Sequence, residues 1–432
     1  MNYQHILKNT RVCVIGLGYV GLPLAAGFAR ETKVYGYDVS HQRVKDLAKG
    51  IDVNLDFTKE QLRQAHLEIS TDPSIINKAN VIIICVPTPL KENTTQPDLR
   101  LLEDATKTVG KYMNKNSLVV FESTVWPGAT EEICLPLLEQ HSGMKLDKDF
   151  GLGYSPERIN PGDKTHTIES VVKVVAGHTS ECAKTLASLY KRVAKNGVFI
   201  ATNIAVAEAA KIIENTQRDV NIALMNEFSL ICDRLGISTY DVLDAARTKW
   251  NFLDFYPGLV GGHCIGVDPY YLAHRAQQLG LTPKIILAGR SLNGFMAEHV
   301  AHKMMYELQA SGKKPADCSI LVMGLTFKEN VPDIRNSKAK EVIDTLRKYH
   351  CRIVAVEPLI DREIAKHEFG VELAEFSHLQ ETFDGIMIIN KHHAFHDIPL
   401  RSFLRLLKEP GVVIDLKRML PQLQDYTRYL TL

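Results

Sequence analysis

The feature that most constrains the fold is a run of apolar, strand-forming residues at 12–15 that leads directly into the pattern G-x-G-x-x-G. In dinucleotide-binding α/β units, the first glycine permits a tight turn, the second lets backbone approach a pyrophosphate, and the third lets the next helix pack closely on the sheet. Gly16, Gly18 and Gly21 take these places here. The pattern therefore predicts a doubly wound domain that binds a dinucleotide in its first βα turn.

A second apolar run, residues 34–37, ends at Asp38, 22 residues after the first glycine of the pattern. An acid at this place bonds ribose hydroxyls and repels a 2′-phosphate, so the sequence predicts NAD as the cofactor rather than NADP. Arg43 leaves NADP open, because a nearby arginine can accommodate the extra phosphate; a solvated helix face is its other interpretation. Tyr19 and Val20 complete the predicted cofactor loop.

Three regions follow one another along the 432 residues, of which 45% are hydrophobic. Residues 1–202 are predicted to form an NAD-binding Rossmann domain, 203–310 a central helical domain, and 311–432 a smaller Rossmann-like domain. The fold class is thus α/β, with two doubly wound parallel-sheet domains joined by a central helical domain with a long linker helix over 204–235. An apolar face on this helical region predicts a homodimer. The strands are predicted at residues 12–15, 34–37, 81–86, 118–121, 171–175, 320–324, 352–356, 385–389 and 412–415.

Charge and cysteine usage exclude several protein classes. A net charge of +1, with no basic run or zinc-finger spacing, argues against a nucleic-acid partner. No apolar stretch reaches membrane-spanning length and the N-terminus lacks a signal-peptide pattern, so we expect a cytoplasmic protein with no membrane partner. The eight cysteines form no C-x-x-C pair, and Cys13 and Cys85 are expected in the core. His392 and His393 have no third ligand at a suitable spacing, which indicates a solvated turn and no metal site.

Polar residues follow two of the predicted strands. Thr88 comes after the strand at 81–86, and Thr124 after the strand at 118–121. Open α/β sheets bind ligands at the carboxyl ends of their strands, so both hydroxyls are candidates for the nicotinamide side of the cofactor or for positioning water. Each threonine alone could equally be a helix N-cap or a turn residue. Their shared location carries the hypothesis.

One cysteine lies in a setting unlike the others. Gly261 and Gly262 precede Cys264, and Asp268 follows it by four residues. Most cysteines are structural and buried, but a Gly-Gly pair packs poorly and lets backbone approach a ligand closely. Beside a dinucleotide motif, such a thiol is a candidate nucleophile that could carry an aldehyde on to an acid.

Lys211 and Asn215 stand four residues apart on the predicted long helix and therefore on one of its faces. A charged donor and an amide donor directed at one place suit the stabilisation of an oxyanion. The alternative is a surface lysine with an incidental neighbour.

With these motifs, the chain resembles members of the UDP-glucose/GDP-mannose dehydrogenase superfamily. Within it, the chain is most similar to the bacterial UDP-N-acetylhexosamine (UDP-GlcNAc/UDP-GalNAc) 6-dehydrogenases of the Vi-antigen/O-antigen type. The resemblance covers nearly the whole chain. The segments that carry it most specifically are 154–162, 214–219, 257–271, 326–330 and 332–336.

The resemblance implies a four-electron oxidation of a sugar C6 alcohol to a carboxylate, with two NAD molecules consumed, for surface polysaccharide (capsule or O-antigen) synthesis. Cys264 would attack the C6 aldehyde, and hydride loss from the thiohemiacetal would leave a thioester. Lys211, Asn215 and Asp268 would manage charge on the C6 oxygen and its water. Thr124 and Glu157 would orient or activate water for hydrolysis of the thioester.

The resemblance also implies the substrate contacts. Lys328 would contact the nucleotide sugar from the C-terminal domain, which would then bind the UDP-sugar. Arg335 would close over the cofactor, and Lys417 or Arg418 would meet the diphosphate. The implied substrate-binding residues are Glu157, Arg158, Asn160, Lys211, Asn215, Gly261 and Lys328.

Two places where this chain departs from its relatives bear on the substrate. Arg158 and Asn160 stand where UDP-glucose dehydrogenases typically carry an apolar pair, and their donors suit an acetamido carbonyl, with GlcNAc or GalNAc favoured over ManNAc. A phosphate, or an acid across the dimer, is the other possible partner of Arg158. Tyr256 stands where close relatives often carry a basic residue, with Asp254 two residues earlier, so contacts assigned to that basic residue do not transfer.

Other functions remain open at this stage. UDP-glucose or UDP-ManNAc could be the substrate of the same reaction. A two-electron β-hydroxyacid dehydrogenase would share the glycine pattern and the helical middle, but it needs neither Cys264 nor a second α/β domain. A noncatalytic sensor of nucleotide sugars would keep the glycines and lose the nucleophile.

Overall fold

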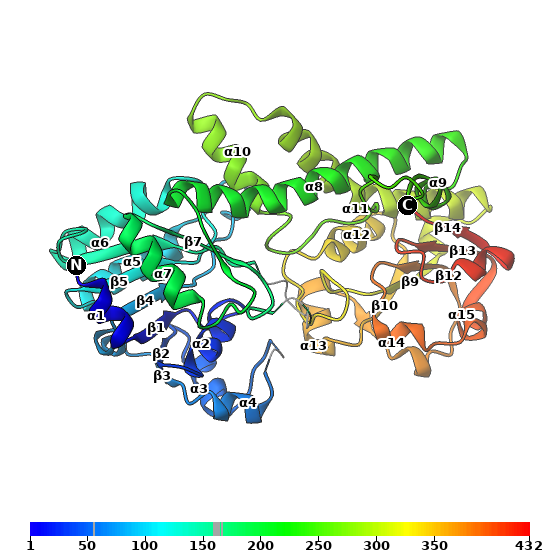
Figure 1. Cartoon of the computed structure of the whole chain (residues 1–432). Helices are drawn as coiled ribbons and strands as arrows, with labels where there is room; N and C mark the ends of the chain where they lie inside the picture. Colours follow the sequence, from blue (N-terminus) through cyan, green and yellow to red (C-terminus); the bar gives the residue numbers. More distant parts are fainter. Residues whose placement is uncertain (55–56, 159–164, 166) are drawn as a thin grey trace. The chain divides into compact units, whose positions relative to one another are not determined.

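The computed structural model describes residues 1–54, 57–158, 165 and 167–432. The chain divides into two compact units (Figure 1). The first comprises residues 1–215 with 270–282, and the second comprises 216–269 with 283–432. Within the described residues, no helix is both long enough and apolar enough to cross a membrane.

The first unit contains an eight-stranded sheet among its described residues, in the order β3-β2-β1-β4-β5-β6-β7-β8. The structure confirms strands at the five places predicted for it, with slightly different bounds. The strands β3, β6 and β8 were not predicted. The bounds are β1 Arg11–Ile15, β2 Lys33–Tyr37, β3 Glu68–Ser70, β4 Val81–Ile84, β5 Ser117–Phe121, β6 Phe150–Tyr154, β7 Lys173–Gly177 and β8 Val198–Ile200.

The expectation of a wholly parallel sheet is wrong at one point, because β7 runs antiparallel to β6 and pairs Gly153 with Gly177. Hydrophobicity alone does not indicate a strand's direction, since a buried strand reads as apolar either way. The strands from β1 to β6 are parallel, and the register aligns Ile15, Ile84, Phe121 and Tyr154. The residues that follow these strands therefore lie along one edge of the sheet.

Helices pack against this sheet over a fully buried apolar core that includes Val14, Phe28, Ile83 and Val120. The helix α2 contacts β1 and β2, and α7 contacts β6, β7 and β8. The helices wholly within the first unit are α1 Tyr3–Lys8, α2 Gly21–Ala29, α3 His41–Ala48, α4 Lys59–Gln64, α5 Arg100–Tyr112, α6 Leu135–Ser142 and α7 Ser180–Tyr190.

Two helices run from one unit into the other. The longer, α8, spans Ile204–Leu235, as predicted from the apolar spacing. The shorter, α10, spans Asp268–Gln278. The predicted absence of strands from 203 to 308 is confirmed, since every residue of this stretch is described and none is in a strand.

The second unit contains a six-stranded parallel sheet among its described residues, in the order β11-β10-β9-β12-β13-β14. The strand β9 pairs with β10 and β12, which places it at the centre, as in a Rossmann-like sheet. The bounds are β9 Ser319–Met323, β10 Arg352–Val356, β11 Glu372–Leu373, β12 Phe383–Ile388, β13 Leu407–Asp415 and β14 Arg428–Leu430.

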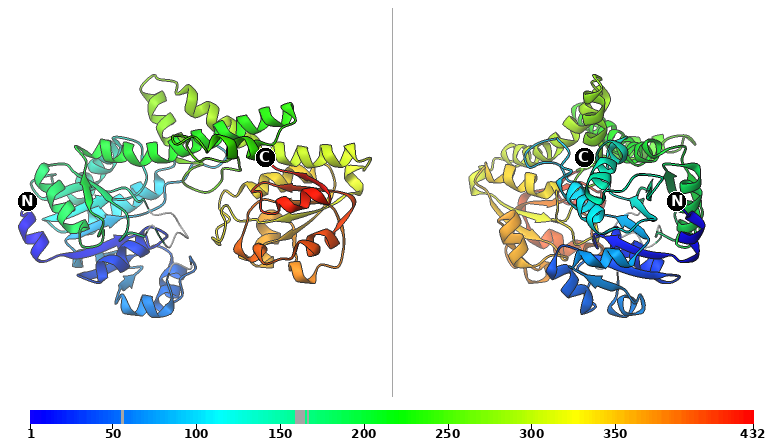
Figure 2. Two further views of the ribbon diagram at one scale, coloured as in Figure 1. Left: turned by 45° about the vertical axis from the view of Figure 1, so that its right-hand side comes forward. Right: turned by 90° about the vertical axis from the view of Figure 1, so that its left-hand side faces the viewer.

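Both faces of this sheet are covered (Figure 2). Alternate residues of each strand point to opposite faces, so Val322 packs with α11 and α12 in one apolar cluster, and Met323 packs with α15 in another. The confirmed fold class is therefore α/β, with two open sheets and a helical middle region. The other helices of this unit are α9 Thr239–Ala246, α11 Lys284–Ala310, α12 Lys338–Arg347, α13 Arg362–Ile364, α14 His393–His396 and α15 Leu400–Leu406.

Candidate active site

The glycine loop between β1 and α2 has the geometry that its sequence pattern predicts. Gly16 adopts a left-handed backbone with φ +88°, and its N–H donates to the Tyr37 carbonyl at 2.8 Å. A Cβ on Gly21 would lie 1.8 Å from the Gly16 oxygen, whereas a Cβ on Gly18 would meet nothing within 4 Å. Gly21 thus permits close helix packing, and the open space at Gly18 suits the approach of a pyrophosphate. Tyr19 and Val20 lie between Gly18 and the first residue of α2.

Asp38 and Arg43 both contact this loop. The Asp38 carboxylate accepts hydrogen bonds from the N–H groups of Leu17 and Ser40, at 2.8 and 2.9 Å. Arg43 donates from Nε to the Leu17 carbonyl at 2.9 Å and forms an ion pair with Asp52, and only 11% of its side chain is exposed. The solvated helix face considered for Arg43 is therefore wrong, because these two contacts fold the side chain onto the loop.

The ends of β4 and β5 are joined by two side-chain hydrogen bonds. The Thr88 hydroxyl donates to the Thr124 carbonyl at 2.7 Å, and the Ser123 hydroxyl donates to the Val86 carbonyl at 2.6 Å. Tyr271 donates in turn to the Thr88 carbonyl at 2.8 Å. The structure therefore brings the two predicted threonines together at the carboxyl edge of the sheet.

Glu157 lies at the same edge, just after β6. Its residue is 7% exposed, and one carboxylate oxygen accepts the Arg158 N–H at 2.6 Å. Arg158 itself forms an ion pair with Glu214 at 2.7 Å and donates to the Val172 carbonyl at 2.9 Å. An acid of the same chain therefore already partners the guanidinium that was predicted to bind an acetamide. Asn160, predicted beside it, lies outside the described residues.

Lys211 and Asn215 lie on the described helix α8, both half-buried, at the predicted spacing of four residues. The first turns of this helix are anchored by Glu208, which is fully buried. Its carboxylate accepts the N–H groups of Gly128 and Thr130, at 2.5 and 2.9 Å. Burial raises the pKa of Glu208 to about 7.

In the second unit, Cys264 differs from the other cysteines in exposure. All eight cysteines are described; seven are buried, including Cys13 and Cys85 as predicted, and Cys264 is half-buried. Its carbonyl accepts the N–H groups of Val267 and Asp268, which ends the loop and begins α10. Asp268 is 2% exposed at the first position of that helix.

The two glycines before Cys264 fit tightly against the protein itself. Gly262 has φ +78°, and a Cβ there would lie 2.6 Å from the Phe327 ring, while a Cβ on Gly261 would lie 2.6 Å from the Asn336 oxygen. Asn336 also accepts the Gly262 N–H at 3.1 Å and donates its amide to the Gly262 carbonyl at 2.8 Å. The expectation that this pair packs poorly is wrong. The absent side chains allow the loop to lock onto the segment 326–337.

A buried polar network fixes the start of the same loop. Asn226 of α8 donates to the Gly258 carbonyl at 3.0 Å and accepts its N–H at 2.8 Å. Asn226 also donates to Asn293 of α11, whose amide donates to the Asp219 carboxylate at 2.7 Å. Arg290 completes the network through an ion pair with Asp219 at 2.6 Å. Asp219 is therefore part of the scaffold behind the cysteine loop.

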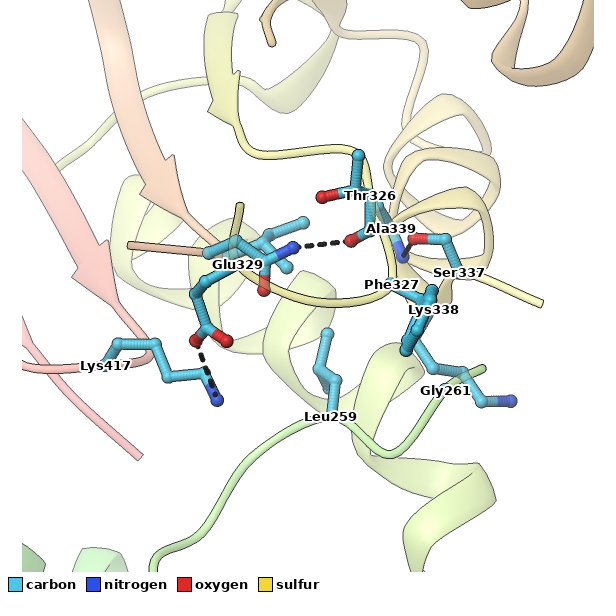
Figure 3. A pocket seen from close by; sticks show the side chains of 11 residues that line it. Leu259, Gly261, Thr326, Phe327, Glu329, Ser337, Lys338, Ala339 and Lys417 are labelled. Atoms are coloured by element: carbon cyan, nitrogen blue, oxygen red, sulfur yellow. Dashed lines mark hydrogen bonds and ion pairs between the residues drawn. The ribbon is translucent and has the colours of Figure 1, made fainter. Parts of the chain in front are cut away.

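A pocket in the second unit lies where β9 ends and α12 begins (Figure 3). The empty space at this pocket measures ≈ 350 Å³ when the adjoining open solvent is included. Lys338 is the first residue of α12, and Lys417, which follows β13, pairs with Glu329 at 3.5 Å. The lining residues are Leu259, Gly261, Thr326, Phe327, Glu329, Ser337, Lys338, Ala339, Ile389, Asn390 and Lys417. A helix N-terminus with two lysines is a favourable place for an anion.

The basic residues that were predicted to contact substrate or cofactor in this unit differ in their partners and in their exposure. Lys417 lines the pocket, while Arg418 forms ion pairs with Asp241 and Asp244 of α9. Lys328 is half-buried in the segment after β9. Arg335 is exposed over 52% of its side chain and donates to both oxygens of Asp333. Of Lys417 and Arg418, only Lys417 is therefore among the residues that line the pocket.

Arg247 lies over the Tyr256 ring, at 4.0 Å from its centre, and pairs with Asp254 at 2.5 Å. The structure changes the expectation for His392. His392 is 1% exposed and lies 3.1 Å from Glu357, so the predicted solvated turn is wrong for this histidine.

Sequence reasoning also missed several residues around these sites. Lys173 and Glu122 are buried beside Glu157. A lysine within the apolar run V-V-K-V-V-A was the available signal for the first of these. Lys338 directly follows Ser337, the N-cap of α12, and a helix start with a lysine could have suggested the anion pocket. Asn226 gave no signal, because its partner Gly258 is distant in sequence, and segment 332–336 pointed to Asn336 without indicating its contact with Gly262.

Comparison with known proteins agrees with this arrangement of domains and motifs. Three models of the UDP-glucose/GDP-mannose dehydrogenase family match the chain: the NAD binding domain at residues 10–194, the central domain at 205–294, and the UDP binding domain at 321–422. The chain belongs to this family.

Relatives within the UDP-glucose/GDP-mannose dehydrogenase family match over nearly their full length. Protein CapL of Staphylococcus aureus is 46% identical, over 95% of this chain and 96% of its own. The UDP-N-acetyl-D-glucosamine 6-dehydrogenase of Salmonella typhi is 45% identical, over 98% and 99%. Among solved structures, the UDP-D-ManNAc dehydrogenase of Pyrococcus horikoshii superposes with a TM-score of 0.88 at 29% identity, over 98% of each chain.

Proposed function

We propose that this protein oxidises C6 of a UDP-N-acetylhexosamine to the uronic acid in two NAD-dependent steps, for the synthesis of a surface polysaccharide. The observation that carries the proposal is the single cysteine left half-buried, Cys264, in a loop held by Asn226 and Asn336. Relatives that share 45–46% of their residues with this chain are named UDP-N-acetyl-D-glucosamine 6-dehydrogenases, which supports the same substrate class.

The residues of the glycine loop fit the proposed cofactor. Gly18 leaves open space, Gly16 and Gly21 hold the turn against α2, and Asp38 places a carboxylate beside the loop, where it favours a free ribose hydroxyl. Arg43, Thr88, Thr124 and Arg335 are the other residues proposed to bind the cofactor. When bound, NAD supplies the acceptor for the hydride that C6 loses in each of the two steps.

Cys264 is proposed as the nucleophile. Its sulfur bonds to the C6 aldehyde carbon, and the resulting thiohemiacetal stays on the enzyme until the second oxidation leaves a thioester. Lys211, Asn215 and Asp268 are proposed to balance charge on the C6 oxygen during these steps. Holding the aldehyde covalently explains why one enzyme can complete both oxidations without releasing it.

Glu157 and Thr124 are proposed to act on the water that hydrolyses the thioester. Glu157 lies at the carboxyl edge of the sheet, beside the strand end that carries Thr124. A carboxylate there can take a proton from water while the threonine helps to orient it. Its low exposure keeps bulk water from competing for the same oxygen atoms.

The pocket at the start of α12 is the proposed place for the diphosphate of the substrate. Backbone N–H groups at a helix N-terminus, together with Lys338 and Lys417, offer positive charge without requiring a metal ion. Gly261 lines the same pocket, so the cysteine loop borders the proposed diphosphate site. Lys328 is proposed to contact the sugar.

A panel of UDP-sugars with NADH counted per sugar tests the function. The unaltered enzyme should form two NADH per UDP-N-acetylhexosamine. Cys264→Ala should lower carboxylate formation by roughly 10³-fold or more, by analogy with loss of other nucleophiles. One NADH per sugar, with free aldehyde released by the unaltered enzyme, would contradict the thioester mechanism.

The preference for an acetamido sugar is tested at Arg158. If its guanidinium bonds the acetamide, Arg158→Leu should reduce the preference over UDP-glucose by roughly 5- to 150-fold, corresponding to about 1–3 kcal/mol for an unpaired buried group. Glu214→Gln is the matched control, since it removes the partner that the structure gives to Arg158. An unchanged preference in Arg158→Leu, or an equal change in both variants, assigns Arg158 to the scaffold instead.

We further propose that the protein is a cytoplasmic homodimer built on its helical middle region. Exposed apolar side chains on α8, including Leu224, Ile231 and Leu235, support such a contact. Light scattering that finds a fully active monomer at micromolar concentration would contradict the dimer.

A further inference from the structure

A lysine is buried between two glutamates inside the first unit. Lys173, at the start of β7, has no exposed side-chain surface, and its Nζ lies 2.7 Å from Glu122 and 3.1 Å from Glu157. Glu122 is also fully buried. Taking three charges out of water is strongly unfavourable unless they compensate one another. Such a cluster is unusual enough to call for an explanation beyond packing.

The cluster contains one more carboxylate than it has cations. The Tyr190 hydroxyl of α7 donates to the second oxygen of Glu122. Burial raises the pKa of Glu122 to about 7, and burial together with the Glu122 charge raises the pKa of Tyr190. Burial alone would lower the pKa of Lys173, but the two carboxylates outweigh it and the pKa is raised. The lysine therefore stays charged, while one proton can be shared among the carboxylates.

Among the described residues, the titratable groups around Lys173 come from the ends of three strands and one helix. Cys85 follows β4, Glu122 follows β5, Glu157 follows β6, and Tyr190 ends α7. Burial, followed by the Glu122 charge, raises the pKa of the Cys85 thiol, so this thiol stays protonated. Cys85, Glu122 and Glu157 all follow parallel strands at the carboxyl edge of the sheet, and Glu157 is the one proposed to act on water.

We propose that Lys173 is a positioning residue that keeps Glu157 ionised and aimed for thioester hydrolysis, and that Glu122 balances its charge whenever Glu157 takes up a proton. The inference rests on the proposed function, in which Glu157 is the base. With Glu157 ionised, Lys173 is shared between two carboxylates. With Glu157 protonated, Lys173 and Glu122 form a neutral pair, so the sheet interior is never left with an uncompensated cation.

The proton balance of the hydrolysis step is closed. The water oxygen bonds to the thioester carbon while one water proton moves to Glu157. The carbon–sulfur bond then breaks, the Cys264 sulfur takes up a proton from water, and Glu157 releases its proton to water. One water is consumed, Cys264 is a thiol again, and the acid product loses its remaining proton to solvent. Neither an oxidant nor a reductant is needed in this step.

The experiment compares pH profiles of thioester hydrolysis, measured from the fraction of acylated Cys264 by quenched-flow mass spectrometry during turnover. Lys173→Met should move the acidic limb to higher pH by about 1–3 units, because Glu157 loses its counter-charge and gains a proton more readily. Glu122→Gln should move the limb to lower pH, because the ammonium then serves Glu157 alone. Loss of packing alone would not shift the two profiles in opposite directions.

The double variant Glu122→Gln/Lys173→Met removes a cation and an anion together and keeps the net charge of the cluster, so it should fold even if Lys173→Met does not. Its acidic limb should lie above that of Glu122→Gln, which isolates the effect of the lysine. If Glu122→Gln and the double variant have their acidic limbs at the same pH, the proposal is overturned. If the unaltered enzyme forms no acylated Cys264, the proposed function fails instead, so the two failures are distinguishable.

Discussion

Replacing Arg290 by methionine tests the buried network behind the cysteine loop. Asp219 is fully buried and Arg290 is 6% exposed, so Arg290→Met leaves a carboxylate in the protein interior without its cation. Breaking a buried ion pair from one side costs about 3–5 kcal/mol. In a unit of roughly 200 residues, each kcal/mol lowers the Tm by about 2–4 °C, so the expected loss is about 6–20 °C.

The same variant should loosen the loop that holds Cys264. Asn293 bonds both Asp219 and Asn226, and Asn226 holds Gly258 at the start of that loop. We expect faster alkylation of Cys264 by iodoacetamide, followed by mass spectrometry at temperatures where the protein stays folded. Calorimetry at pH 8 gives the Tm. At pH 5.5 the loss should be smaller, because an unpaired Asp219 can take up a proton.

Two controls make this reasoning refutable. Arg428→Met removes an arginine of the same unit whose side chain is 61% exposed, and it should cost less than about 1 kcal/mol. Asp219→Asn/Arg290→Met removes both buried charges and should recover most of the lost stability. A Tm loss below 3 °C in Arg290→Met, or a double variant as unstable as the single one, would show that the ion pair is not the source of the effect.

Three further predictions concern the two glycine-containing loops and the buried carboxylate of Glu208. Gly21→Ala should weaken both NAD binding and thermal stability, since its Cβ would lie 1.8 Å from a main-chain oxygen. Gly18→Ala should weaken NAD binding alone, because a Cβ there would meet nothing within 4 Å. Titration with NAD and thermal denaturation separate the two effects. Glu208→Gln should flatten part of the pH dependence of the free energy of unfolding. Because the pKa of Glu208 is raised to about 7, its stabilisation is complete below pH about 4.5 and about 3 kcal/mol is lost as the pH rises to about 7. Denaturation of the unaltered protein and of Glu208→Gln at pH 5 and pH 8 measures this difference. Gly262→Ala should cost about 1–2 kcal/mol from its left-handed backbone. Its Cβ would also press on Phe327, so Phe327→Leu should restore part of the loss, and an unaltered Tm in Gly262→Ala would contradict the tight loop.

The sequence predicted those features that arise from short-range pattern. The glycine loop followed from its glycine spacing, and the central strands of both sheets and the bounds of α8 followed from apolar spacing. Each of these patterns involves only residues that are close in sequence. The short strands β3 and β8, at three residues each, were missed because they carry too few residues for a pattern. The antiparallel direction of β7 was missed because direction depends on the path of the chain between strands.

The candidate site was predictable as a set of residue types, and less so as a set of partners. Cys264, Thr88 and Thr124 could be singled out by their place after strands or within a glycine-rich loop. The ion pair of Arg158 with Glu214 joins residues 56 positions apart, and no local pattern reports such a contact. The contacts of Gly262 with segment 326–337 were hidden for the same reason, since glycine in a sequence does not reveal whether a ligand or the protein comes close.

The interlocking of the cysteine loop with segment 326–337 has a consequence for the construction of chimeras. Gly261 and Gly262 on one side, and Phe327 and Asn336 on the other, touch at distances that admit no additional carbon atom. A crossover between α11 and β9 that brings in another relative's C-terminal domain would pair two surfaces that had not been selected together. An exchange intended to alter the choice of sugar nucleotide should therefore carry residues 257–268 and 326–337 as one inherited module.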